Sequence, residues 1–210
     1  MKKILPLLLL LFPVLVFAQI GIKGGLNFAK VSKSSDINSS SRSGFHVGLL
    51  LAPPSKKIIS SRTELLFSRQ GYDYKSSTNT GNVNLDYIHM GQLMSINITK
   101  YVSLMFGAQT AYLISAQVDS SNNGTSSENK IMDLYNRIDY GYALGAEVHP
   151  VMGLIIGARY NVSLAKVYKD IQSMQKPSFT SEDAKNNLVQ LYVGWRFGKQ
   201  SSSKSKKKEK

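Results

Sequence analysis

The sequence predicts an all-β fold, an eight-stranded antiparallel transmembrane β-barrel with long extracellular loops and short periplasmic turns. Three observations lead to this prediction. Eight segments alternate between apolar and polar or small residues with the period of two that is typical of β-strands. The connections between these segments are alternately long and short. No long apolar run follows the first 18 residues, so a membrane could be crossed only by strands that close into a barrel.

The N-terminal segment has the pattern of a Sec signal peptide. Lys2 and Lys3 form a basic start, an apolar run follows, and Val16-Phe17-Ala18 suits a cleavage site. The apolar run is short and contains two prolines, which favours a cleaved signal over a membrane-spanning helix. We therefore expect three regions: a signal peptide over residues 1–18, an outer-membrane β-barrel domain over residues 19–198 and a basic disordered tail over residues 199–210.

The eight expected strands and their connections follow in chain order. The strands are residues 19–30, 43–52, 58–70, 85–97, 101–117, 137–149, 153–165 and 187–198. The long connections, rich in Ser, Asn, Asp, Lys and Gly, lie near residues 31–42, 71–84, 118–136 and 166–186. The short ones lie near residues 53–57, 98–100 and 150–152. Outer-membrane barrels place long loops outside and tight turns in the periplasm, and an even strand number brings both ends to the periplasm.

Apolar residues occupy one face of the expected strands, with Tyr, Trp and Phe common near the strand ends, as in a lipid-facing band with aromatic girdles. The first two strands carry Ile20, Ile22, Leu26, Phe28, Phe45, Val47, Leu49 and Leu51. The fourth and fifth carry Ile88, Met90, Met94, Ile96, Val102, Leu104, Phe106, Ala108 and Tyr112. The last three carry Ile138, Tyr140, Tyr142, Leu144, Ala146, Val148, Leu154, Ile156, Ala158, Tyr160, Val162, Val189, Leu191, Val193, Trp195 and Phe197.

The opposite face is polar or small, which suits a narrow interior with room for side chains and little else. Its polar members are Lys23, Asn27, His46, Glu64, Ser68, Gln109, Asp139, Glu147, Arg159, Asn161, Gln190 and Arg196. A soluble barrel of the lipocalin type would turn this face to water. The face is too rich in Gly and too poor in Lys and Glu for that role, so the membrane barrel is favoured.

The segment 85–97 is the least regular of the eight. Gln92 shares the apolar face with Ile88, Met90, Met94 and Ile96. A lipid-facing amide costs free energy unless a bulge or a partner relieves it. Either the register differs from this assignment, or a protein contact lies on this side of the barrel.

Four short motifs carry a resemblance to a known family. They are "GIKGGLNFAKV" (21–31), "TELLFSRQGY" (63–72), "ARYNVSL" (158–164) and "LVQLYVGWRF" (188–197). Their order and spacing resemble the PorT-like outer-membrane β-barrel domain family of Bacteroidota, described mostly as porin-family proteins. The resemblance spans nearly the whole chain after residue 18. It implies an eight-stranded antiparallel barrel and no settled activity, although one class of members is tied to protein secretion.

This chain departs from that family's pattern in two places. The fourth strand of the family usually holds an acidic residue and a Pro, where Tyr87-Ile88-His89-Met90-Gly91 stands here. A basic tail also follows the terminal aromatic residue, Phe197.

Charged residues on the inward face need partners, because an unpaired buried charge is very costly. Arg159 falls in the middle of its strand, and Glu64, also in mid-strand, is its first expected partner. We predict a lumen charge network made of Glu64, Asp139, Glu147, Arg159, Arg196 and Lys23. Its simplest role is to fill and close a small barrel. The alternative is a selectivity filter for small solutes.

The net charge and composition limit the kinds of partner that this chain is expected to bind. The formal net charge is +13, and the tail contributes six Lys against one Glu. We expect the barrel to contact outer-membrane lipid and lipopolysaccharide, the long loops to contact a protein partner, and the tail to contact anionic lipid or peptidoglycan. Nucleic acid is not an expected partner, because no basic-aromatic binding motif is present. The chain has no Cys, which excludes thiol chemistry.

The predicted function is that of a non-enzymatic protein of the cell outer membrane. His46, His89 and His149 are not accompanied by a nucleophile motif, and no metal-ligand spacing is seen, so we expect no enzyme activity, cofactor or metal. We expect a structural scaffold, an adhesion protein or a secretion and assembly component that acts through its long loops. The alternatives are a narrow porin-like channel for small solutes and, third, a lipid-modifying outer-membrane enzyme.

Overall fold

The strands of the computed structural model close into one barrel. The structure describes residues 19–32, 38–52, 58–75, 80–120, 124–125, 132–169 and 185–197. The expected signal peptide, the expected tail, the 53–57 turn and parts of the long connections lie outside the described residues. The strands are β1 (Gln19–Ser32), β2 (Asn38–Ala52), β3 (Ile59–Lys75), β4 (Thr80–Asn97), β5 (Val102–Ser120), β6 (Gly124–Thr125), β7 (Ile138–Val148), β8 (Leu154–Ser163) and β9 (Lys185–Arg196).

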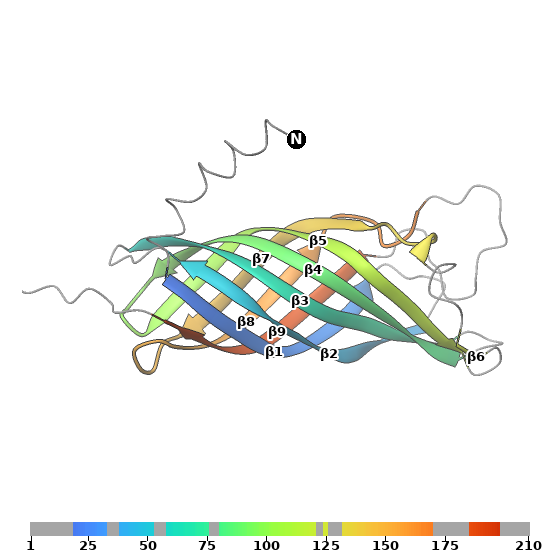
Figure 1. Cartoon of the computed structure of the whole chain (residues 1–210), viewed down its shortest axis with the longest axis horizontal. Helices are drawn as coiled ribbons and strands as arrows, with labels where there is room; N and C mark the ends of the chain where they lie inside the picture. The colour runs from blue at the N-terminus through green and yellow to red at the C-terminus, as the bar shows by residue number, and fades with distance from the viewer. Residues whose placement is uncertain are drawn as a thin grey trace, which may run out of the picture.

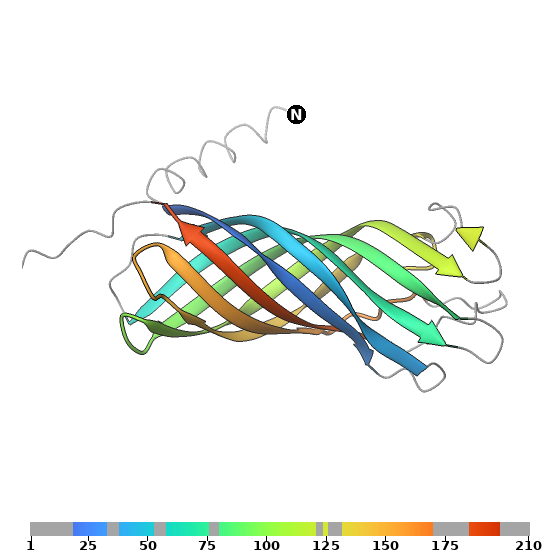
Figure 2. The same cartoon turned by 90° about the horizontal axis from the view of Figure 1, so that it is seen from below.

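Every strand of the ring is antiparallel to both of its neighbours. The order runs β4-β3-β2-β1-β9-β8-β7-β5, and pairing of β4 with β5 closes the ring (Figures 1 and 2). β6 has only two residues and pairs with the end of β5 outside the ring. The prediction of an eight-stranded antiparallel barrel is therefore confirmed. Closure leaves no unpaired sheet edge, which is what a spanning sheet requires in lipid.

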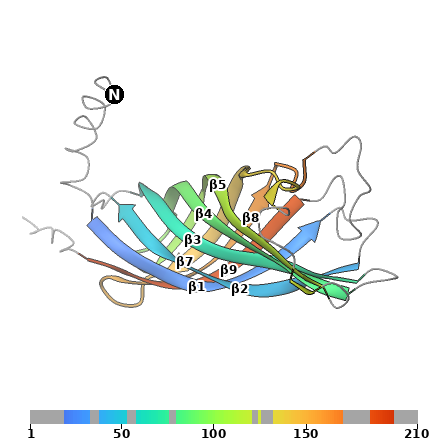
Figure 3. The same ribbon diagram turned by 45° about the vertical axis from the view of Figure 1, so that its right-hand side comes forward.

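The two ends of the barrel differ (Figure 3). The short connections lie at one end, together with the start of β1 and the end of β9, and we call it the short-turn end. The turn between β7 and β8 contains Gly153 with a φ of 94°, a conformation that favours glycine. The long connections lie at the other, long-loop end. There β3 extends to Lys75, β4 begins at Thr80 and β5 extends to Ser120. The 71–84 connection, which was expected as a loop, is therefore mostly a continuation of the hairpin formed by β3 and β4.

The outward face forms a continuous, mainly apolar band. Its residues are the outward-facing ones within 20–28, 45–51, 59–67, 88–96, 104–114, 138–148, 154–164 and 189–197. Ile22, Val47, Leu144 and Val193 are each about half exposed, at 50%, 53%, 53% and 53% of their surface. Half-exposed aliphatic side chains on all sides of a barrel suit a lipid environment. Among the described residues, no helix is long and apolar enough to cross a membrane.

The inward face is buried and forms two apolar clusters. The first lies at the long-loop end and contains Tyr72, Val83, Leu85, Tyr87, Ala111, Leu113, Ala116, Val118, Tyr135, Val167 and Tyr168. The second lies in the short-turn half and contains Leu50, Ala52, Leu93, Met105, Ala143, Ile155 and Tyr192. In the strand register Leu50 pairs with Glu64 and Leu93 with Arg62, so the second cluster lies beside charged residues.

Candidate functional site

Glu64 is the centre of a buried charge network inside the barrel. Its carboxylate lies 3.0 Å from Lys23 Nζ, 2.8 Å from Arg159 Nη1 and 3.0 Å from Arg62 Nε. The four side chains come from β1, β3 and β8, and none of the four residues is more than 7% exposed. Three cations around one carboxylate more than neutralise its charge, and they leave positive charge that a second carboxylate must balance.

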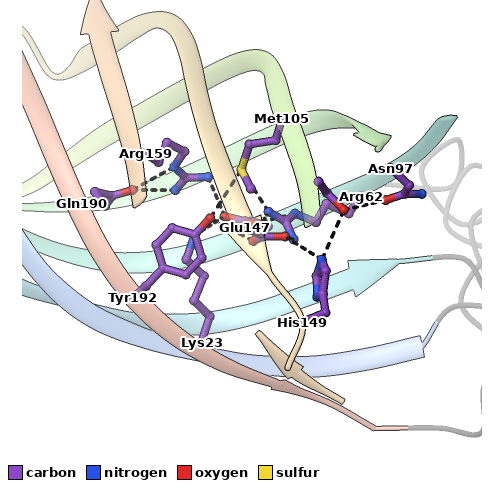
Figure 4. A network of polar contacts seen from close by, with 11 residues as sticks. Lys23, Arg62, Asn97, Met105, Glu147, His149, Arg159, Gln190 and Tyr192 are labelled. Atoms are coloured by element: carbon purple, nitrogen blue, oxygen red, sulfur yellow. Dashed lines mark hydrogen bonds and ion pairs between the residues drawn. The ribbon is translucent and has the colours of Figure 1, made fainter. Parts of the chain in front are cut away.

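Glu147 on β7 supplies the second carboxylate. Arg62 donates to it through both terminal nitrogens, at 2.9 Å and 2.6 Å, in a bidentate pair. The Tyr192 hydroxyl donates to the same carboxylate at 2.8 Å. Figure 4 shows Arg62 and Tyr192 converging on Glu147 across the interior. The Tyr192 ring also lies 3.6 Å below the Lys23 ammonium, which adds a cation–π contact.

Uncharged amide and imidazole groups continue the network toward the long-loop end. Arg159 donates to Gln190 Oε1 at 3.0 Å and 2.6 Å, and Gln190 in turn donates to Asn27 Oδ1 at 3.0 Å. Asn27 Oδ1 also lies 2.8 Å from His46 Nδ1. A second chain joins Asn186, Gln70 and His89 through contacts of 2.6 Å and 2.7 Å. These bonds link β1, β2, β3, β4, β8 and β9 across the interior.

A tyrosine cluster closes the interior at the long-loop end. The hydroxyl of Tyr72 on β3 meets the hydroxyls of Tyr135 and Tyr168, which belong to the connections before β7 and after β8. Tyr135 and Tyr168 also pair through an isolated β-bridge, and their rings lie 5.0 Å apart. Burial raises the pKa of both hydroxyls well above the usual value, so they remain neutral hydrogen-bonding groups. Two connections are thereby held across the barrel mouth.

The structure brings four of the six residues of the predicted network together and leaves two apart. Glu64, Glu147, Arg159 and Lys23 share the network described above. Asp139 instead accepts a hydrogen bond from Ser163 Oγ nearer the long-loop end. Arg196 is half-buried at the short-turn end and forms no ion pair with another described residue. The inclusion of Asp139 in the predicted network is therefore corrected, and Arg196 lies beside the network without a direct ion pair to it.

The sequence prediction also missed Arg62, which is the link between the two carboxylates. Arg62 contacts Glu64 and Glu147, and no other described residue pairs with both. A signal was present in the sequence, because Arg62 lies two residues before Glu64 and so on the same face of the strand.

Among the described residues, His149 does not form a catalytic triad. His149 Nε2 lies 3.3 Å from Ser103 Oγ and 3.8 Å from Glu147, so serine and carboxylate share one ring nitrogen. A Ser-His-acid triad needs them on opposite nitrogens. Burial lowers the pKa of the His149 imidazole below its usual value, which favours the neutral ring at neutral pH. No group of three or more His, Cys, Asp or Glu able to hold a metal occurs in the described part of the chain.

Comparisons with known proteins agree with this architecture. A family model described as outer membrane protein beta-barrel domain matches residues 16–169. The crystal structure of Ail, the attachment invasion locus protein of Yersinia pestis, in complex with the heparin analogue sucrose octasulfate, is similar. The identity is 18%, the TM-score 0.51, and 86% of this chain and 99% of that chain are covered.

Neisserial surface protein A is a second similar solved structure. Its sequence is 18% identical to this chain and the TM-score is 0.52, and the match covers 85% of this chain and 97% of that chain. At this level of identity the likeness to both structures shows the fold alone. Among curated proteins, none matches the sequence.

Proposed function

Because the chain belongs to the outer membrane protein beta-barrel domain family and lies in the outer membrane, we propose that it is a non-conducting scaffold that acts through its long-loop end. The filled interior carries this proposal. The charge network, the amide chains and the tyrosine cluster occupy successive parts of the lumen. An eight-stranded barrel has little space beyond its own side chains. With its interior filled, the protein presents only its surfaces to partners.

The long-loop end is the surface we assign to an outside partner, in an adhesion or assembly role. Outer-membrane barrels turn their long connections outward. In the described segments there, Arg137, Lys166 and Lys169 are exposed, against the exposed acid Asp133. Basic side chains on anchored loops suit an anionic polysaccharide or the phosphates of lipopolysaccharide. The similar Ail structure holds a heparin analogue, which supports a polyanion as the class of partner.

Sucrose octasulfate is a direct probe of this binding role. We expect cells that express the chain to bind labelled sucrose octasulfate or heparin, with binding that weakens as salt rises. Replacing Arg137, Lys166 and Lys169 together with Gln should reduce binding several-fold. The same change at Lys100, which is exposed in a short turn at the opposite end, is the matched control. Equal binding by both variants would contradict a polyanion site on these loops.

Single-channel recording separates the scaffold from the alternative of a narrow channel. We expect no discrete openings from purified, folded protein in a planar bilayer, because side chains fill the lumen. The Arg159→Ala variant, recorded beside it, removes one of the largest lumen side chains. Openings in the unmodified protein that change in size or selectivity with Arg159→Ala would favour the channel and overturn the scaffold.

The finer family assignment remains a proposal. The motifs resemble PorT-like barrels of Bacteroidota, some of which are tied to protein secretion. A secretion or assembly role, contact of the basic tail with anionic lipid or peptidoglycan, and removal of residues 1–18 by signal peptidase are compatible with a scaffold. An enzyme acting on lipids is disfavoured by the His149 geometry described above.

A further inference from the structure

The lipid-facing band carries its polar residues on one wall. Among the described residues of the band, β1, β2, β7, β8 and β9 turn only aliphatic, aromatic or glycine residues outward. The neighbouring strands β3, β4 and β5 also turn Ser and Thr and one Gln outward. We call this surface the polar wall, and with the small Ala108 it consists of Ser61, Thr63, Gln92, Ala108 and Thr110.

Gln92 is placed at the middle of the polar wall. It lies midway between Ile88 and Ile96, the outward residues at the two limits of the band on β4, and it is exposed. Thr63 Oγ1 donates a hydrogen bond of 2.7 Å to Gln92 Oε1. The amide nitrogen of Gln92 finds no acceptor among the described residues. The register of this strand follows the alternation in the sequence, and the irregular pairing with β5 occurs only near Asp86 and Tyr87.

An unsatisfied amide in the middle of the band is costly in lipid. Hydrocarbon offers it neither donor nor acceptor. A partner that relieves this cost must present a polar group at the same depth, so it must itself cross the membrane. A second copy of this chain does so without further requirement, since it brings the same amide to the same depth. A primary amide both donates and accepts, so two copies about a two-fold axis can exchange N–H···O bonds.

The shape of the polar wall favours close approach of a second barrel. In the strand register Gln92 pairs with Thr63 on one side and Ala108 on the other, and both are small. Small residues let backbones approach closely within a membrane. The wall carries no charged side chain in the band, so a second copy meets no like charge there. On β9, across the barrel, the outward residues are larger: Val189, Leu191, Val193 and Trp195.

We propose that a second copy of this chain packs against the polar wall, with the two Gln92 side chains hydrogen-bonded to each other across a two-fold axis. The interface lies within the membrane and is independent of the partner proposed for the long-loop end.

Cysteine cross-linking tests this interface directly, because the chain has no Cys of its own. The full chain is expressed with Ala108→Cys, and outer membranes are treated with a short, membrane-permeant reagent that carries two thiol-reactive maleimide groups. Leu191→Cys on β9 is the matched control, since it is also outward-facing and half exposed, at 47%. We expect a cross-linked dimer from Ala108→Cys that clearly exceeds the control. Co-expression of two differently tagged copies identifies the second copy in the product.

A further variant tests whether the contact between the two copies depends on the Gln92 amide. Adding Gln92→Leu to Ala108→Cys should lower the dimer fraction roughly threefold to tenfold, as expected for loss of the two hydrogen bonds that the amides exchange within the membrane. Leu suits the lipid-facing surface, and heat-modifiable gel mobility verifies that each variant is folded. The proposal is overturned by dimer yields equal to the Leu191→Cys control, by a dimer that Gln92→Leu leaves unchanged, or by cross-linking to a different protein.

Discussion

Replacing Glu64 with Leu should lower the free energy of unfolding of the barrel by about 3–5 kcal/mol, the usual cost of breaking a buried ion pair from one side. Lys23, Arg62 and Arg159 all contact this carboxylate. Without it, three buried cations face Glu147 alone. Urea unfolding in detergent, followed by the heat-modifiable gel shift, measures the loss. Asp139→Asn is the control, since Asp139 is outside the network and contacts Ser163, and it should cost about 1 kcal/mol.

A second substitution should separate electrostatics from packing. Adding Lys23→Met to Glu64→Leu restores the excess of one positive charge that the unmodified network has. We expect the double variant to be more stable than Glu64→Leu alone, although Lys23→Met also removes the contact with the Tyr192 ring. If the double variant is instead less stable by the sum of the two single effects, the network does not act through charge balance.

Replacing Gly25 with Ala should also destabilise the barrel strongly. A Cβ at Gly25 would collide with the carbonyl oxygen of Leu191 and lie 2.6 Å from the Tyr192 Cα. Both are backbone atoms of β9, so relief requires β1 and β9 to separate. Forcing extra volume into a packed interior typically costs about 1–3 kcal/mol, and here it also strains the β1–β9 pairing. The urea midpoint and the folded fraction measure the effect.

Gly24 provides the matched control for this substitution. It lies next in the chain and faces the lipid, and a Cβ there would come no closer than 3.5 Å to the His46 carbonyl oxygen. Gly24→Ala should therefore leave stability unchanged or raise it by a few tenths of a kcal/mol. Equal loss in both variants would mean that the interior contact at Gly25 does not limit the packing of the barrel.

Strand parity, meaning the face of the barrel to which each strand residue points, is the part of this structure that the sequence predicts well. The alternation of apolar and polar residues placed Lys23, Glu64, Glu147 and Arg159 inside the barrel and the aromatic and aliphatic residues outside. Parity is local, because successive side chains of a strand point to opposite faces whatever the rest of the chain does. The length pattern of the connections added the strand number and the antiparallel order.

The depth and partners of inward side chains are not local properties. Asp139 and Arg196 have inward parity, yet Asp139 contacts Ser163 and Arg196 forms no ion pair with another described residue, so neither is bonded to the network. Strands in a barrel are tilted and staggered, and this stagger sets the height of each residue. Arg159 and Glu64 lie 95 residues apart in the sequence, and their mid-strand positions predicted this pair. Arg62 and Glu147 lie 85 residues apart, and no period in the sequence specifies that pair.

The tyrosine cluster shows the same limit at the long-loop end. Tyr135 and Tyr168 belong to connections in which no alternation predicts a direction, so the sequence predicted long loops that contact a partner and no cluster of their tyrosines inside the barrel. Closure of the ring brings them to Tyr72 on β3. The sequence by itself determined which face of each strand meets lipid, because that follows from a repeat of two residues. Only the tertiary structure decided that Arg62 joins the two carboxylates and what covers the mouth, because both depend on how far each tilted strand is shifted along its neighbour.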